Sequence, residues 1–211
     1  MKTKRALIAC FLIAIGQVSI ASAQTSTLHQ PVSFKLRNGM SVIVAENTGT
    51  PKVYSSFTLE DGTTEAPAPV THTILTMMLN DIALDTQAGI SFNEKGGNIA
   101  NSIAGFDNAL LALSTTVTNA DLTEVLFEKT KASLLESVNK RLKYYPSTVT
   151  EANIQSTTLN DIKTCYASSY QPSKACLTIA GNITPAEARI LVKKAFEEWK
   201  ETTVDNTTTS R

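Results

Sequence analysis

Histidine is scarce in this sequence, with only His29 and His72 among 211 residues. A metal site built from imidazole needs several such side chains, or cysteine and carboxylate partners beside them. Cysteine is scarce too, with three residues. His29 lies in a segment without periodic pattern and is expected to be solvated. Histidine chemistry in the folded part of the chain is therefore limited to His72.

An excess of charge of one sign is also absent, because 19 basic residues balance 19 acidic ones. Loss of the first 23 residues, which hold three basic and no acidic side chains, would leave 16 basic against 19 acidic residues and a formal charge of −3. No basic face remains to attract a phosphate backbone. The composition therefore predicts no nucleic-acid partner.

The N-terminal segment has the three parts of a secretory signal. Basic residues precede an apolar run over 6–20, and Ala21-Ser22-Ala23 offers a cleavage site. We expect residues 1–23 to be removed and the protein to be exported, to the periplasm or the outside of a bacterium. Lipid attachment at Cys10 is the less favoured alternative, because only four apolar residues lie between Arg5 and Cys10.

The rest of the chain divides into three parts. Residues 24–31 form a polar lead-in, residues 32–200 carry the periodic patterns of a folded domain, and the Thr/Asn-rich residues 201–211 are expected to be disordered. No later apolar run approaches the ~20 residues needed to cross a bilayer. We therefore predict one domain without a membrane span.

Alternating apolar residues predict the strands. Asn38-Gly39 between two alternating runs is typical of a hairpin, and a third strand is expected over 52–59. A second hairpin is expected where Gly96-Gly97-Asn98 introduces residues 99–103 and a turn leads into 111–117. One more strand is expected over 175–180.

Helical periodicity predicts the helices. Residues 70–82 have a broad apolar face, and a capping box at Thr118 is expected to open a helix of about twenty residues. Two further capping boxes, at Thr158 and Thr184, predict the last two helices. Residues 147–156 have no clear period. This order of elements predicts an α+β fold, an antiparallel sheet with helices packed on one face.

Two segments resemble a known family. The run Phe34–Val44 with Pro51-Lys52-Val53 is similar to the opening of a module of the pitrilysin/insulinase zinc peptidases, which include the mitochondrial processing peptidase. The run Tyr166–Glu187, continued by Phe196–Lys200, is similar to the end of that module. The resemblance spans residues 32–200 and implies the fold of a single module of that family.

Active members of that family carry His-x-x-Glu-His, the inverzincin motif, on a helix. Its two histidines bind zinc and its glutamate activates the bound water. At the position of the motif this sequence has His72-Thr73-Ile74-Leu75-Thr76, with Leu75 for the base and Thr76 for the second histidine, while Glu136 falls near the distal ligand. The resemblance therefore implies the fold without catalytic residues, zinc or another cofactor, and with His72 and Glu136 as remnants.

Active members also bind extended peptide along an edge strand after a Gly-Gly pair. Here Ala100, Asn101 and Ser102 follow Gly96-Gly97 and are the residues that the resemblance implies for peptide binding. Because the family places several modules around a chamber, self-association or docking onto a catalytic peptidase is expected. The alternative function is a zinc metallopeptidase whose site is completed by another chain, and only this alternative needs zinc.

Cys165 and Cys176 remain after removal of the signal. In an oxidising compartment they could form a disulfide across the short loop around Tyr170–Ser173. They could equally be two small buried hydrophobic residues. The sequence leaves both interpretations open.

Overall fold

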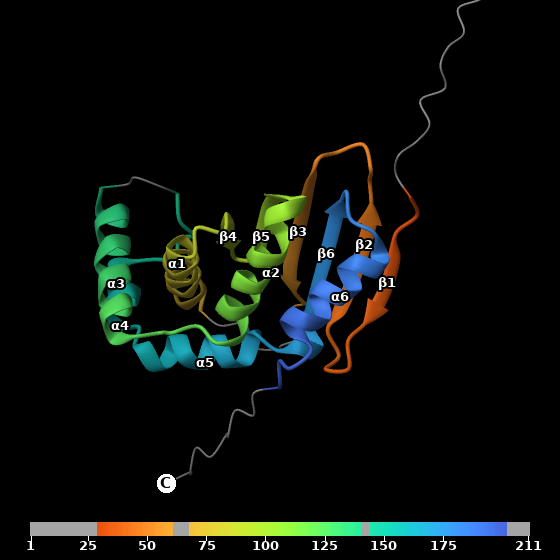
Figure 1. The fold of residues 1–211 in the computed structure, drawn as a ribbon. Coiled ribbons are helices and arrows are strands. Elements are labelled where there is room, and N and C mark those ends of the chain that lie inside the picture. The colour runs from red at the N-terminus through yellow and green to blue at the C-terminus, as the bar shows by residue number, and fades with distance from the viewer. Residues whose placement is uncertain (1–28, 61–67, 141–143, 202–211) are drawn as a thin grey trace, which may run out of the picture.

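The computed structural model describes residues 29–60, 68–140 and 144–201. The expected signal sequence, the lead-in as far as residue 28 and the tail from residue 202 lie outside the described residues. Six strands form one sheet with the order β1-β2-β6-β3-β5-β4, and helices accompany it (Figure 1). The elements are β1 (Val32–Lys35), β2 (Ser41–Glu46), β3 (Lys52–Leu59), α1 (Pro69–Asp85), β4 (Ile90–Asn93), β5 (Gly96–Ser102), α2 (Ile103–Thr118), α3 (Glu124–Asn139), α4 (Glu151–Ser156), α5 (Leu159–Ser169), the 3₁₀ turn η1 (Pro172–Lys174), β6 (Ala175–Gly181) and α6 (Pro185–Phe196).

The sheet is antiparallel except for one pair. β2 runs parallel to β6, whereas β1–β2, β3–β6, β3–β5 and β4–β5 are antiparallel. The parallel pair arises because β6 returns from the end of the chain and inserts between β2 and β3. The predicted α+β class with helices on one face is confirmed, and the sheet is mostly, not wholly, antiparallel.

The core lies on one face of the sheet. Alternate residues of β3 and β6, such as Phe57 and Leu177, are fully buried there, and α2 and α6 lie over this face (Figure 1). α1 contacts β4, α3 and α5 and extends the helical layer past the β4 edge. The opposite face of the sheet carries half-buried small side chains near its centre, among them Ser56, Thr178 and Ala180.

The turn after β1 is joined to the end of α6 by one side chain. The Asn38 carboxamide donates to the carbonyls of Phe196 (2.8 Å) and Trp199 (3.0 Å). Phe57 stacks on Phe196 from the middle of β3, with the ring centroids 6.2 Å apart. The first hairpin and the last helix, the two segments that carry the family resemblance, therefore pack into one unit. The predicted hairpin forms, but of its two turn residues Gly39 alone has positive φ (+93°), and the Leu36 N–H closes the turn by donating to the Met40 carbonyl (2.9 Å).

The expected second hairpin is wrong in its second half. β5 pairs with β4, which precedes it, and residues 111–117 belong to the helix α2. The alternation at 111–117 is misleading, because the buried residues Phe106, Leu110, Leu113 and Val117 follow one another three or four positions apart. The Ser102 hydroxyl accepts from the Gly105 N–H (3.3 Å) and so caps the N-terminus of α2.

The long helix begins later than predicted. Thr118 ends α2 and does not open α3, whose N-cap is Thr123, with its hydroxyl accepting from the Leu126 N–H (3.3 Å). The capping boxes at Thr158 and Thr184 are confirmed. Residues 151–156, which had no clear period, form the short helix α4.

Across the described ranges, none of the helices combines the length and the apolar character that a membrane span needs.

Candidate functional site

A cavity of about 570 Å³ opens beside α1, at the β4 edge of the sheet. Three segments form its wall: one face of α1, the end of β4 with the turn that follows, and the connection between α3 and α4. Its lining consists of Thr73, Thr76, Met77, Asn80, Phe92, Asn93, Glu94, Lys95, Tyr144, Tyr145 and Pro146. A volume of this size is typical of sites for small ligands or peptide side chains.

The face of α1 that lines the cavity has helical spacing. Thr73, Thr76, Met77 and Asn80 recur at intervals of three, one and three residues and so share one side of the helix. Leu75 points to another side of the helix, where it is only 2% exposed and packs in the core. If His72, Leu75 and Thr76 stand for the three motif residues, Leu75, at the position of the glutamate, therefore points away from the cavity.

His72 and Glu136, the two expected remnants, occupy unlike surroundings. His72 is half-buried on α1 and is not part of the cavity wall. Glu136 is exposed on α3, where it accepts from Lys140 one turn further on (2.5 Å). Within the described residues no three side chains of histidine, cysteine, aspartate or glutamate gather as a metal-binding group. The geometry here supplies no ligand set for zinc.

The expected peptide-binding residues lie at the end of β5. Ala100 and Ser102 are exposed and Asn101 is half-buried. β5 is the second strand from the edge: β4 covers it as far as Ile99, and β3 pairs with its other side through to Ser102. Only the last three residues of β5 are left without a β4 partner. Whether they bind peptide stays a prediction.

A second hollow of about 340 Å³ adjoins those residues on the uncovered face of the sheet. Its walls include Tyr54, Ala100, Thr178 and Ala180, and no charged residue takes part. Such a surface suits neutral, small side chains. Its polar groups are neutral hydroxyls and an amide, from residues such as Ser56, Asn98 and Thr178.

The two cysteines are free thiols in the structure. Burial raises the pKa of Cys165 to about 11, against a smaller opposing effect of a hydrogen bond with Ser169. Burial also raises the pKa of Cys176. Both thiols are thus protonated at neutral pH and are poor nucleophiles. The disulfide between them stays a prediction for oxidising conditions.

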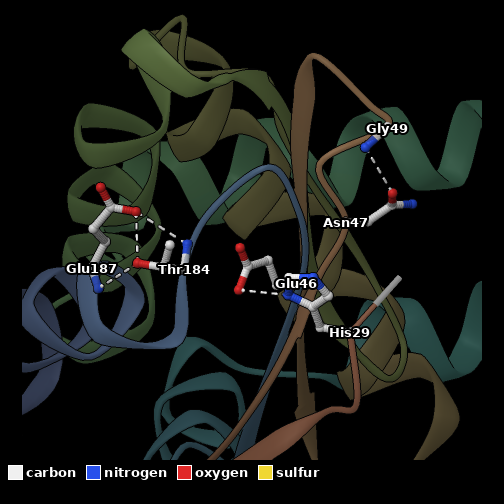
Figure 2. A network of polar contacts seen from close by, with 6 residues as sticks. All are labelled: His29, Glu46, Asn47, Gly49, Thr184 and Glu187. Carbon is white, nitrogen blue, oxygen red and sulfur yellow. Dashed lines mark hydrogen bonds and ion pairs between the residues drawn. The ribbon is translucent and has the colours of Figure 1, made fainter. Parts of the chain in front are cut away.

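His29 has a carboxylate partner of its own. Figure 2 shows its ring beside Glu46 at the end of β2, with Nδ1 3.2 Å from the carboxylate oxygen. The main-chain N–H of His29 also donates to the main-chain carbonyl of Glu46 (3.0 Å). The side chain is 58% exposed, in keeping with the solvated position expected for it. This pairing ties the segment before β1 to β2.

Sequence reasoning missed most of the cavity wall. Asn80, Met77 and the two tyrosines were not singled out, because none belongs to a motif. In the sequence, only the α1 part of the cavity wall is indicated, by the helical spacing of Thr73, Thr76, Met77 and Asn80. The contribution of Tyr144 and Tyr145 depends on the path of the α3–α4 connection, which has no local pattern.

Residues 156–210 match the family described as the peptidase M16 inactive domain. The chain is also similar to a protease from Helicobacter pylori, with a TM-score of 0.71 and 18% identity over 87% of this chain and 54% of that one. The fold of this chain is that of the M16 peptidases. The resemblance to pitrilysin-type peptidases expected from the sequence is confirmed, since pitrilysin itself has a TM-score of 0.67, with 13% identity over 93% of this chain and 25% of that one.

The periplasmic protease PqqL from Escherichia coli gives a TM-score of 0.71, with 10% identity over 87% of this chain and 25% of that one. The chain therefore spans about half the length of the Helicobacter protease and a quarter of PqqL and pitrilysin. A separate comparison with curated proteins found no match to the sequence. The match to an inactive-domain family supports the prediction of a non-catalytic protein.

Proposed function

We propose that this chain is a non-catalytic, exported member of the M16 group that holds a protein partner or an extended peptide. The observation that carries the proposal is the α1 wall of the cavity, where Thr73, Thr76 and Met77 stand. These residues have the i, i+3, i+4 spacing of a His-x-x-Glu-His motif. None of their side chains can serve as a metal-bound imidazole or as a general base.

The position of this wall also moves the alignment of the sequence with the His-x-x-Glu-His motif by one residue toward the C-terminus. We infer that Thr73, Thr76 and Met77, and not His72, Leu75 and Thr76, occupy the motif positions, because they face one cavity whereas Leu75 is buried in the core. His72 then falls outside the motif altogether. The inference removes the last imidazole from the place where zinc would be bound.

The partner role is supported by the match to the inactive-domain family and by the fold shared with longer peptidases. The Helicobacter protease and pitrilysin are about two and four times as long as the aligned part of this chain. A second copy of this chain or a catalytic peptidase of the same fold is the expected partner. Export is supported by the signal-like N-terminus and by the periplasmic location of PqqL.

Affinity capture from a periplasmic extract tests the partner role, together with sedimentation of the purified protein. We expect either self-association or recovery of an M16 peptidase, identified by mass spectrometry. A protein that stays monomeric at all concentrations and recovers no peptidase or peptide would contradict the proposal. Unrelated proteins recovered equally by a heat-denatured sample would count against it as well.

A further inference from the structure

β4 is the last strand of the sheet, and one side chain covers its outer edge. Among the residues that the structure describes, β4 pairs with β5 alone, so the main-chain groups on its other side have no strand there to bond. An edge of this kind is a template for another chain. At Phe92 the edge is occupied by Asn80 of α1.

The Asn80 carboxamide bonds Phe92 as a neighbouring strand would. The Phe92 N–H donates to Asn80 Oδ1 (2.8 Å), and Asn80 Nδ2 donates to the Phe92 carbonyl (2.9 Å). In an antiparallel ladder a hydrogen-bonded pair exchanges the same two bonds, one N–H and one C=O from each residue. Asn80 therefore takes the place of one residue of an added strand.

A third bond holds this arrangement in place. The second N–H of the Asn80 amide donates to the Thr76 carbonyl (2.9 Å), so both donors and the acceptor are engaged. The carboxamide is fixed at the edge from its own helix. A competitor must replace two bonds to Phe92 and release the side chain into solvent.

The space that an added segment needs is already present. Asn80 and Phe92 both line the 570 Å³ cavity, which continues past Asn93 to Lys95. On its far side Tyr144 and Pro146 form the wall. The cavity of about 570 Å³ gives a short extended segment space beside β4.

We propose that the outer edge of β4 is a concealed strand-addition site for an extended peptide, with Asn80 as its internal competitor. The peptide pairs with Phe92 by main-chain hydrogen bonds once the carboxamide has turned away. Its main chain, and not a particular side chain, supplies the two bonds. This site rests on the proposed peptide-holding function and differs from the β5 residues Ala100–Ser102.

Peptide affinity in Asn80 variants tests the proposal. The probe is a fluorescent synthetic peptide with the sequence of residues 52–59, which are extended in this chain, and its binding is measured by fluorescence anisotropy. Removing the competitor in Asn80→Ala should tighten binding about tenfold relative to the parent, as expected for two neutral hydrogen bonds. The matched control is Asn108→Ala, which truncates an exposed asparagine of α2 and should bind like the parent.

Amide hydrogen exchange at Phe92 locates the binding. In the parent this amide should be protected, and in Asn80→Ala it should exchange faster until the peptide is added. The Ser91 amide, on the β5 side of the strand, should not change. Equal peptide affinity in parent and variant, or tighter binding without renewed protection of Phe92, would overturn the proposal.

A second variant at Asn80 covers the case in which Asn80→Ala does not fold. If Asn80→Ala loses its native circular dichroism, Asn80→Asp is used instead, because it keeps the acceptor for Phe92 N–H and loses the donor. Asn80→Asp should then raise the peptide affinity by less than the tenfold expected for complete removal of the carboxamide. An affinity equal to that of the parent would overturn the proposed site. Failure here with a partner recovered from the extract would remove only this site, whereas failure of both would remove the peptide-holding function.

Discussion

Two regions of the molecule contrast in how completely they are filled. Around Phe57 the rings of Tyr170, Phe196 and Trp199 lie with centroids 6.1–6.3 Å from its own, and this region is closed. Around Met77, at the β4 edge of the sheet, α1 faces an open cavity. The closed region contains much of the segment that matches the inactive-domain family. The fold is thus maintained in one region, and the surface that could bind a ligand lies in the other.

The largest expected effect distinguishes the two faces of α1. Leu75→Glu with Thr76→His, which completes a motif from His72, puts a carboxylate into the core and should cost more than about 4 kcal/mol. Thr73→His with Thr76→Glu and Met77→His should fold and bind zinc more tightly than the parent. Urea denaturation and competition with a zinc indicator measure the two results. The reverse pattern would restore the His72 register.

The next effect tests the closed region. Phe57→Ala empties a fully buried ring position and should lower the free energy of unfolding by about 3–5 kcal/mol. Tyr54→Ala is the control on the same strand, since Tyr54 is 46% exposed and should cost about 1 kcal/mol or less. Chemical denaturation compares them, and similar losses would show that the two faces of β3 do not differ.

A smaller effect tests the connection between the first hairpin and α6. Asn38→Ala removes two hydrogen bonds to Phe196 and Trp199 and should cost about 1–3 kcal/mol. Asn108→Ala, with no comparable bonds on α2, should leave the thermal unfolding midpoint nearly unchanged. Equal midpoints for the two variants would mean that the Asn38 contacts do not contribute.

The smallest effect is a dependence on pH at two helix starts. Hydrogen bonds from Thr158 lower the pKa of Asp161, and those from Thr184 lower the pKa of Glu187 (Figure 2). A lowered folded-state pKa stabilises the fold above the unfolded pKa, and this contribution is lost as the pH falls through the folded value. Thr184→Ala should therefore destabilise at pH 7 more than at pH 2.5. A pH-independent loss in thermal melts would contradict this assignment.

Local chemistry made most of the fold predictable. The Asn-Gly turn, the strand over 52–59 and the capping boxes at Thr158 and Thr184 depend on neighbouring residues, and all are confirmed. The α2 segment was misassigned because Leu111, Leu113, Thr115 and Val117 alternate like a strand. Its helical face emerges only when Phe106 and Leu110 are included.

The candidate site was predictable only in part. The loss of the zinc motif is predicted from the sequence position by position, because Leu75 and Thr76 stand where the family has its base and second histidine. The face of α1 that meets the cavity could not, because neighbouring registers both have helical spacing and only packing against the core places Leu75 inside. Likewise, nothing local links Asn80 to Phe92, twelve residues away.

Zinc content together with peptide cleavage is the most direct measurement of the central claim, that this M16-type scaffold has no hydrolytic centre. Purified protein with the signal removed would be analysed for metal and incubated with a mixture of unfolded peptides. We expect neither stoichiometric zinc nor cleavage, in the presence or absence of added zinc. Stoichiometric zinc with cleavage abolished by His72→Ala would contradict the account and favour a zinc peptidase completed by a second chain.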